Sequence, residues 1–162
     1  MIMVTTRILG IDPGFAIIGW AVIDKNGPSI TLKAYGAITT EKNIPIEKRL
    51  LRIFQELEIL LQQHKPQEVA IEQLYFSTNA KTAIDVAQAR GVIVISCAKE
   101  KLPVVSYSPL AVKKTLTGDG KAEKRQVQFM LTKILKIKEA PKPDDVADAV
   151  AIALTHAYTH RY

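Results

Sequence analysis

The chain has little cysteine and no long apolar run. Its one cysteine, Cys97, can form neither an internal disulfide nor a zinc knuckle, and the surrounding VIVISCA predicts a small buried side chain. The nearest approach to a membrane span, residues 86–98, is interrupted by Arg90. The opening MIMVTTR lacks the charged-then-apolar layout of a secretory signal. These absences predict a cytoplasmic protein with a reduced thiol and no membrane partner.

Internal repeats, low-complexity tracts and long linkers are also missing. The 162 residues, of which 48% are hydrophobic, are enough to bury one substantial core. We therefore expect residues 1–162 to form a single domain.

Positive charge is concentrated in one segment. Residues 99–142 hold eleven Lys or Arg against four acids, a net charge of +7, so the rest of the chain sums to −1 within the total of +6. Such a footprint suits a polyanion such as nucleic acid. Ordinary solvated helix faces explain basicity equally well, so charge alone does not decide.

The first half of the chain predicts a meander followed by a helix and a strand. RILGID, AIIGWAVID and SITLKAYGAIT are apolar runs separated by the turn signals Asp-Pro-Gly and Asn-Gly-Pro, which favours three antiparallel strands. Apolar residues recur at three- and four-residue spacing over 46–64, which predicts an amphipathic helix. The following EVAIEQ reads as a short strand parallel to an earlier one.

The second half predicts mainly helices. A long helix should begin near residue 79 and include VIVIS, since Pro103 bounds that run; the strand VVSYS and helices over 109–116, 122–135 and 144–158 follow. This layout resembles the ribonuclease H-like α/β fold, with a mixed five-stranded sheet and helices on both faces.

Acidic residues lie where such a sheet would gather function. Asp12 ends the apolar run ILGI and Glu72 ends VAI, while Asp145 and Asp148 stand three residues apart on the last predicted helix. Asp12 could instead be a turn residue, Asp144 a helix N-cap and the Asp pair a solvated face. Glu72 and Asp148 are embedded in apolar sequence, however, which favours a shared task.

Carboxylates gathered without basic partners repel one another and call for a cation. Their hard oxygen ligands suit Mg²⁺ or Mn²⁺. Two such ions, about 3.5–4 Å apart, can activate a water and stabilise the departing oxygen of a phosphodiester. The acids therefore predict nuclease chemistry.

The sequence resembles the RuvC family of Holliday junction resolvases over nearly its whole length. The resemblance rests on GIDPG (10–14), IEQLYF (71–76), NAKTAIDVAQARG (79–91), VKKTLTGDGKAEKRQVQ (112–128) and DVADAVAIALTH (145–156). It implies that Asp12, Glu72, Asp145 and Asp148 are catalytic and bind the metal, with Mg²⁺ as two ions per site and Mn²⁺ as a substitute. It also implies a homodimer that nicks four-way junction DNA symmetrically, leaving 5′-phosphate and 3′-hydroxyl ends, together with RuvA and RuvB.

The same resemblance assigns DNA contacts. Lys113 and Lys124 match basic residues near the scissile phosphate, and Tyr75 matches a stacking aromatic beside Phe76. Less specific contacts with the DNA backbone are expected from Lys114, Lys121 and Arg125. Ala83, Ala87 and Gly91 form a small-residue ridge that fits either a dimer contact or packing on the chain's own sheet.

Three other classes compete with this interpretation. Actin-like ATPases and sugar kinases share a Gly-Ile-Asp-x-Gly start but need two such domains. A non-catalytic junction-binding protein would need the basic segment and no acids. A resolvase of the YqgF type is closer in class, but the carboxyl-terminal acid pattern and the segment from Lys113 to Lys124 favour RuvC.

The three histidines, at 64, 156 and 160, have no ligand-like neighbours in sequence. We expect the first two to be helix-end residues.

Overall fold

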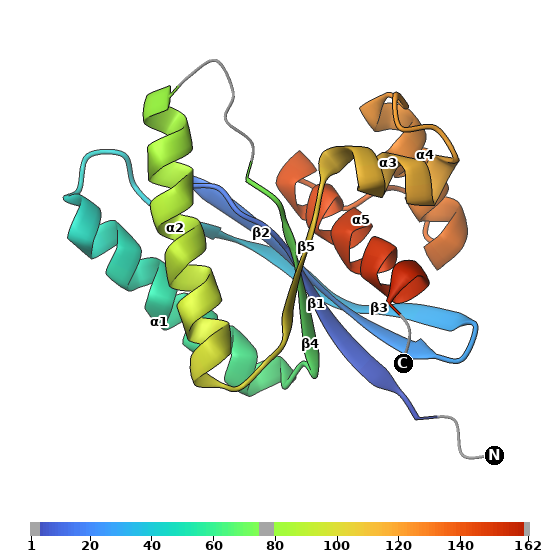
Figure 1. Cartoon of the computed structure of the whole chain (residues 1–162), viewed down its shortest axis with the longest axis horizontal. Helices are drawn as coiled ribbons and strands as arrows, with labels where there is room; N and C mark the ends of the chain where they lie inside the picture. Colours follow the sequence, from blue (N-terminus) through green and yellow to red (C-terminus); the bar gives the residue numbers. More distant parts are fainter. Residues whose placement is uncertain (1–3, 75–79, 161–162) are drawn as a thin grey trace.

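A mixed sheet of five strands forms the centre of the computed structural model, which describes residues 4–74 and 80–160 (Figure 1). The strands are β1 (Thr6–Asp12), β2 (Ile17–Asn26), β3 (Ser29–Thr39), β4 (Glu68–Glu72) and β5 (Val104–Tyr107). Their spatial order is β3-β2-β1-β4-β5. The first three pair antiparallel, whereas β4 is parallel to β1 and β5 is parallel to β4. The predicted meander and the parallel crossover are both confirmed.

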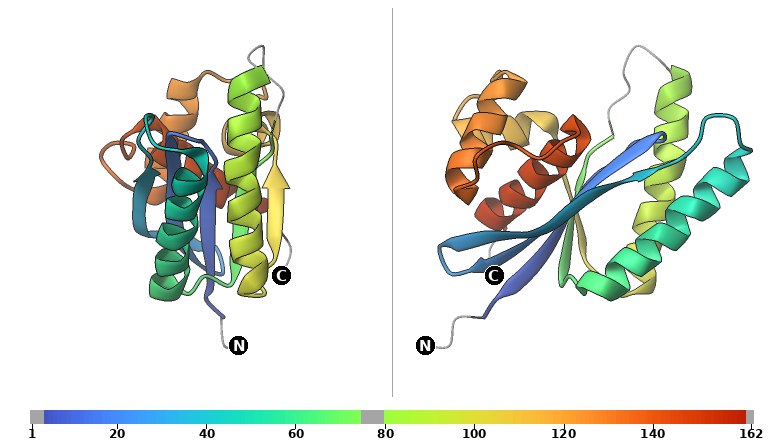
Figure 2. Two further views of the ribbon diagram at one scale, coloured as in Figure 1. Left: turned by 90° about the vertical axis from the view of Figure 1, so that its left-hand side faces the viewer. Right: turned by 180° about the vertical axis from the view of Figure 1, so that it is seen from behind.

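Helices cover both faces of the sheet, as Figure 2 shows in two further views. One face carries α1 (Ile46–His64) and α2 (Ala80–Lys99), and the other carries α3 (Pro109–Thr117), α4 (Lys124–Leu135) and α5 (Asp144–Thr159). The ribonuclease H-like layout is therefore confirmed. The VIVIS run is helical within α2, also as predicted.

Strand alternation divides the core into two clusters. Along β1, Leu9 and Ile11 point to the side of α1 and α2, where they pack with Ile53 and Ile93. Ile8 points to the opposite side, into the cluster built around α5. Because the side-chain period is two, Asp12 falls on the α5 side as well.

Helix α5 is apolar nearly all round and packs directly on the sheet. Every residue from Ala149 to Ala157 is buried. Two strand glycines permit the close approach: a Cβ at Gly10 would lie 2.3 Å from the carbonyl oxygen of Ala149, and one at Gly19 would lie 1.9 Å from that of Asp145. The helix backbone occupies the space that side chains would otherwise fill.

Two local predictions are wrong. The helix expected from residue 122 begins at Lys124, because Glu123 lies in an extended conformation and its N–H donates to the Gln126 side chain over 2.6 Å. Asp144 is not the N-cap of α5: Pro143 occupies that position and Asp144 is the first helical residue. Trp20, on β2, is half-buried against the α1–α2 cluster.

Within residues 4–74 and 80–160, none of the helices combines the length and apolar character needed to span a bilayer.

Candidate metal-binding active site

Two of the predicted acids end neighbouring parallel strands. Asp12 is the last residue of β1 and Glu72 the last of β4, and the register pairs Ile11 with Ile71 just before them. Each acid lies one residue beyond its paired isoleucine, so both side chains leave the sheet on the α5 side. Both are half-buried. Sheet geometry alone therefore brings these two carboxyl groups together.

The other two acids come from the start of α5. Asp145 and Asp148 are both half-buried, and the backbone of Asp145 lies against Gly19, which pairs with Asp12 across β1 and β2. The negative charges of Glu72, Asp148 and Asp145 all act on Asp12. The four predicted acids thus form one cluster, and three separate segments of the chain contribute to it.

Burial and mutual repulsion oppose ionisation of these acids. Burial, followed by the charge of Glu72 and a hydrogen bond to it, raises the pKa of Asp12 to about 9. Burial also raises the pKa of Glu72, although its hydrogen bond with Asp12 works in the opposite direction. Without a cation, burial and repulsion therefore favour a proton retained by this pair.

Lys124 provides the counter-charge that the sequence did not predict. Its Nζ lies 3.1 Å from Oδ2 of Asp148 and 3.3 Å from Oδ2 of Asp144. Burial raises the pKa of Asp148, and Lys124 only partly offsets the effect. Asp144 also accepts a hydrogen bond from Gln128 over 3.3 Å. Asp144 therefore anchors α4 to α5 at the rim of the cluster.

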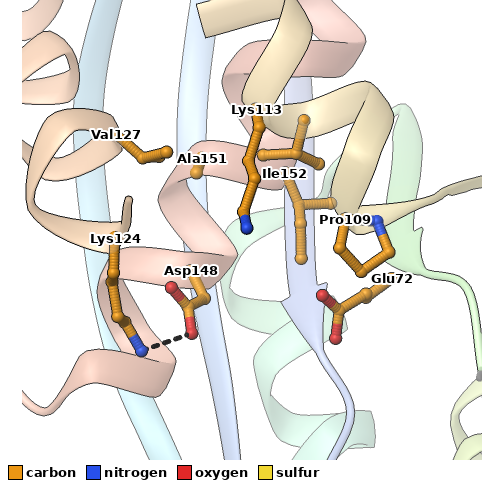
Figure 3. Close-up of a pocket in the computed structure, with 9 residues that line it drawn as sticks. Glu72, Pro109, Lys113, Lys124, Val127, Asp148, Ala151 and Ile152 are labelled. Atoms are coloured by element: carbon orange, nitrogen blue, oxygen red, sulfur yellow. Dashed lines mark hydrogen bonds and ion pairs between the residues drawn. The ribbon is translucent and has the colours of Figure 1, made fainter. Parts of the chain in front are cut away.

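A pocket of about 230 Å³ opens beside the acids. Figure 3 shows Glu72 and Asp148 facing this space together with the ammonium group of Lys113 from α3. Apolar residues also line it, among them Val112, Val127 and Ile152. Acids and lysines thus line one pocket, in which carboxylates could hold a metal ion and ammonium groups could hold a phosphate.

The donor set fits hard divalent cations. The predicted ligands are all carboxylates, and the raised pKa of Asp12 indicates negative charge in excess of what Lys124 neutralises. Asp12, Glu72, Asp145 and Asp148 could hold Mg²⁺ or Mn²⁺ through such oxygens.

The shared proton predicts a pH dependence of stability. An acid whose pKa is higher in the folded chain binds more protons folded than unfolded, so the metal-free fold should lose stability as pH rises from about 4 to about 9. One proton corresponds to a slope of up to about 1.4 kcal/mol per pH unit. Urea unfolding of EDTA-treated wild type and Asp12→Asn at several pH values measures the difference. The wild type should decline more steeply, and equal slopes would contradict a protonated pair.

Two arginines to which the sequence assigned no role hold the backbone segments next to Asp12 and Glu72. The Arg90 guanidinium donates to the carbonyl oxygen of Glu72 over 3.4 Å and to Ser106 Oγ over 2.7 Å. Arg49 is buried, donates to Thr40 Oγ1 and stacks 3.5 Å from the ring centroid of Phe15, in the turn that follows Asp12. An isolated arginine in a helical pattern gives no sequence signal of either role.

The remaining basic residues predicted to contact DNA lie on the α3–α4 side. Lys114, Lys121 and Arg125 are exposed, and Arg125 pairs with Glu123 over 2.8 Å. Tyr75 and Phe76 lie outside the described residues. The small-residue ridge does not form one surface: Ala83 packs inside the chain, whereas Ala87 and Gly91 are exposed.

The family model for crossover junction endodeoxyribonuclease RuvC matches residues 8–156. The chain belongs to the RuvC family. A curated RuvC of Brevibacillus brevis is 49% identical over 93% of this chain and 91% of its own length, and one of Finegoldia magna is 45% identical over 96% and 95%. The resemblance expected from the motifs is thus confirmed across the chain.

Solved RuvC structures share the fold described above. Thermus thermophilus RuvC in complex with a Holliday junction substrate superposes with a TM-score of 0.85 at 33% identity, covering 94% of this chain and 93% of that one. The yeast mitochondrial Holliday junction resolvase, at 16% identity and a TM-score of 0.70, shares the fold alone. In this RuvC-family chain, the four acids lie in three of the motifs that resemble the family, at residues 10–14, 71–76 and 145–156.

Proposed function

We propose that this chain is a metal-dependent endonuclease that resolves four-way DNA junctions by symmetric nicks. The observation that carries the proposal is the cluster of Asp12, Glu72, Asp145 and Asp148, whose mutual repulsion a bound cation would relieve. Membership of the RuvC family and the junction complex of the Thermus relative support four-way junctions as substrate. Nicks leaving 5′-phosphate and 3′-hydroxyl ends fit water as the nucleophile.

The four carboxylates would hold two Mg²⁺ ions, or Mn²⁺ in their place; when bound, these supply an activated water and stabilise charge on the departing oxygen. The chain's own residues do the rest. Lys113 and Lys124 line the same pocket as Glu72 and Asp148, so their ammonium groups can bind phosphate at or near the scissile bond. Lys124 is held by Asp148 and Asp144 in this structure and becomes available to phosphate once these acids are otherwise neutralised.

A non-catalytic junction-binding protein is the principal alternative. Such a protein would gain nothing from half-buried carboxylates at strand ends, because burying a charge without a partner costs free energy. The basic residues of α3 and α4 would serve it equally well. The acid cluster therefore favours the nuclease.

The proposal is tested with a labelled synthetic four-way junction beside a linear duplex of the same sequence. Paired nicks at symmetric positions are expected in the junction with Mg²⁺, and none with EDTA. Nicks that persist in EDTA would refute metal dependence. Equal cleavage of the duplex would refute junction specificity.

Lys124 should contribute one phosphate contact to binding. Replacing it with glutamine should reduce the slope of log affinity against log salt by about one unit. Lys101, an exposed lysine just before β5 and so at the opposite end of the sheet, gives a matched control in Lys101→Gln. Fluorescence anisotropy with a junction in Ca²⁺ measures both. Equal slopes for the two variants would place Lys124 off the DNA.

We further propose a homodimer that uses the outer face of α2. Ile84 and Ile95 are 57% and 60% exposed on this helix, Ala87 lies between them, and a Cβ at Gly91 would meet nothing within 4 Å. This stripe is apolar, and the small side chains at its centre permit close approach of a second helix. Two chains so paired would present two acid clusters, as symmetric nicking demands.

We also propose that residues 1–162 form one nuclease domain. A single sheet that joins both core clusters supports this proposal.

We propose a cytoplasmic location, where a junction resolvase meets the chromosome. The buried free thiol of Cys97 suits a reducing compartment. RuvA and RuvB are the proposed partners, on family resemblance.

A further inference from the structure

A second cluster of potential metal ligands lies at the other end of the sheet from the acids. Glu68 begins β4, which Glu72 ends, a separation of about 13 Å along a strand. His156 follows Asp148 by eight residues on α5, about 12 Å along a helix. Ligand atoms of Glu68, His156 and His160 all lie within 4.8 Å of one another. The two clusters are therefore separate sites.

The imidazole of His156 is held rigidly between two partners. It is fully buried, its Nε2 lies 2.5 Å from Oε2 of Glu68, and its Nδ1 lies 2.8 Å from the Tyr107 hydroxyl. A metal-binding histidine characteristically has its second ring nitrogen fixed by such an outer partner. In this structure a proton lies between Nε2 and Oε2 of Glu68. When a metal ion takes that place, the ring proton moves to Nδ1, which can then donate to the Tyr107 hydroxyl.

His160 completes the group from the end of α5. Its ring stacks on that of His156, with centroids 4.6 Å apart and planes 14° from parallel. The spacing of four residues places both rings on one side of the helix. They also lie at the carboxyl end of α5, where the helix dipole favours positive charge. The ammonium group of Lys25 donates to the carbonyl oxygen of Ala157. Its positive charge repels a cation bound by the two histidines and so lowers the affinity of the site for metal.

We propose that Glu68, His156 and His160 bind a divalent transition metal of the Zn²⁺ class, at a site distinct from the catalytic acids. Two imidazoles and one carboxylate suit Zn²⁺, Co²⁺ or Ni²⁺ better than Mg²⁺. The ion would replace the hydrogen bond between His156 and Glu68, with the Glu68 carboxylate and the His160 ring moving to reach metal-to-ligand distances of about 2.0–2.2 Å and a water in the fourth position. The ion would fasten the last turn of α5 to the start of β4, and so secure the helix that carries Asp145 and Asp148.

The test measures metal binding directly, with excess Mg²⁺ present to occupy the carboxylate cluster. Chain stripped with EDTA is dialysed against Zn²⁺ and its metal content measured, and Co²⁺ titration followed by visible absorption reports nitrogen and oxygen ligands. Wild type should bind one Zn²⁺ per chain. His160→Ala and Glu68→Gln should each bind at least tenfold more weakly. His64→Ala, which changes a histidine at the end of α1, should match wild type.

These variants avoid the fully buried His156, whose truncation could prevent folding. Thermal unfolding checks that each variant folds, and Zn²⁺ should raise the Tm of wild type and His64→Ala only. Failure of wild type to retain Zn²⁺, or equal retention by His160→Ala, would overturn the site. The three residues would then serve only as a hydrogen-bonded anchor between α5 and β4. Nicking with Mg²⁺ is a separate measurement, so the fate of the proposed nuclease does not affect the outcome.

Discussion

Replacing Asp12 with asparagine should lower the rate of junction nicking by at least about 10³-fold. The variant loses a carboxylate ligand of the metal, and the metal stabilises the charge of the transition state by several kcal/mol. Junction affinity should stay nearly unchanged, since the proposed phosphate contacts come from lysines on α3 and α4. Single-turnover cleavage and anisotropy on the same junction separate the two quantities. Metal-free Asp12→Asn should also be the more stable protein at pH 8, because its amide can donate to Glu72 without repulsion.

Asp24→Asn is the matched control for this change. Asp24 lies on β2 and pairs over 2.7 Å with Arg7, near the start of β1. The acid cluster lies at the other end of this strand, at Asp12. Its loss should affect stability modestly and leave nicking intact. Normal nicking by Asp12→Asn would remove Asp12 from the metal site, and a parallel loss of junction binding would mean that the acid also shapes the DNA surface.

Gly19→Ala should disrupt both stability and activity. A Cβ at this position would lie 1.9 Å from the carbonyl oxygen of Asp145 and 2.8 Å from the N of Val146, which are backbone atoms of the first turn of α5. Since the backbone cannot rotate away as a side chain can, α5 must move off the sheet. We expect a loss of about 3 kcal/mol or more, at the upper end of overpacking effects. Nicking should fall at least tenfold even where the protein is fully folded, because Asp145 and Asp148 move with the helix.

Gly91→Ala is the corresponding control, since its Cβ would meet nothing within 4 Å in a single chain. Alanine in place of a helical glycine should increase stability by about 0.5–1 kcal/mol. Urea unfolding at low protein concentration measures both variants, and a cleavage assay compares Gly19→Ala with wild type under conditions where each is folded. Wild-type stability in Gly19→Ala would show that α5 does not rest on this strand.

Much of the architecture was evident in local sequence patterns. Turn signals between apolar runs predicted the meander, and three- and four-residue spacing predicted α1 with its observed bounds. Asp12 and Glu72 were recognisable because each directly follows a buried run, and strands of a parallel pair bring such ends together. In each case the determining interactions span only a few residues, so the sequence alone carries them.

Other features depended on contacts between distant segments. Asp144 looks like an N-cap locally, but α4 brings Lys124 and Gln128 to it and Pro143 takes the cap position. The histidines near the end of the chain have no ligand-like neighbours in sequence, yet Glu68 lies 88 residues before His156 and contacts it. No periodicity or motif encodes such pairs, because they arise only when α5 settles on β1 and β4. The sequence by itself determined the elements, their order and the family, whereas the charge balance of the acid cluster and the second group of ligands were decided by tertiary packing.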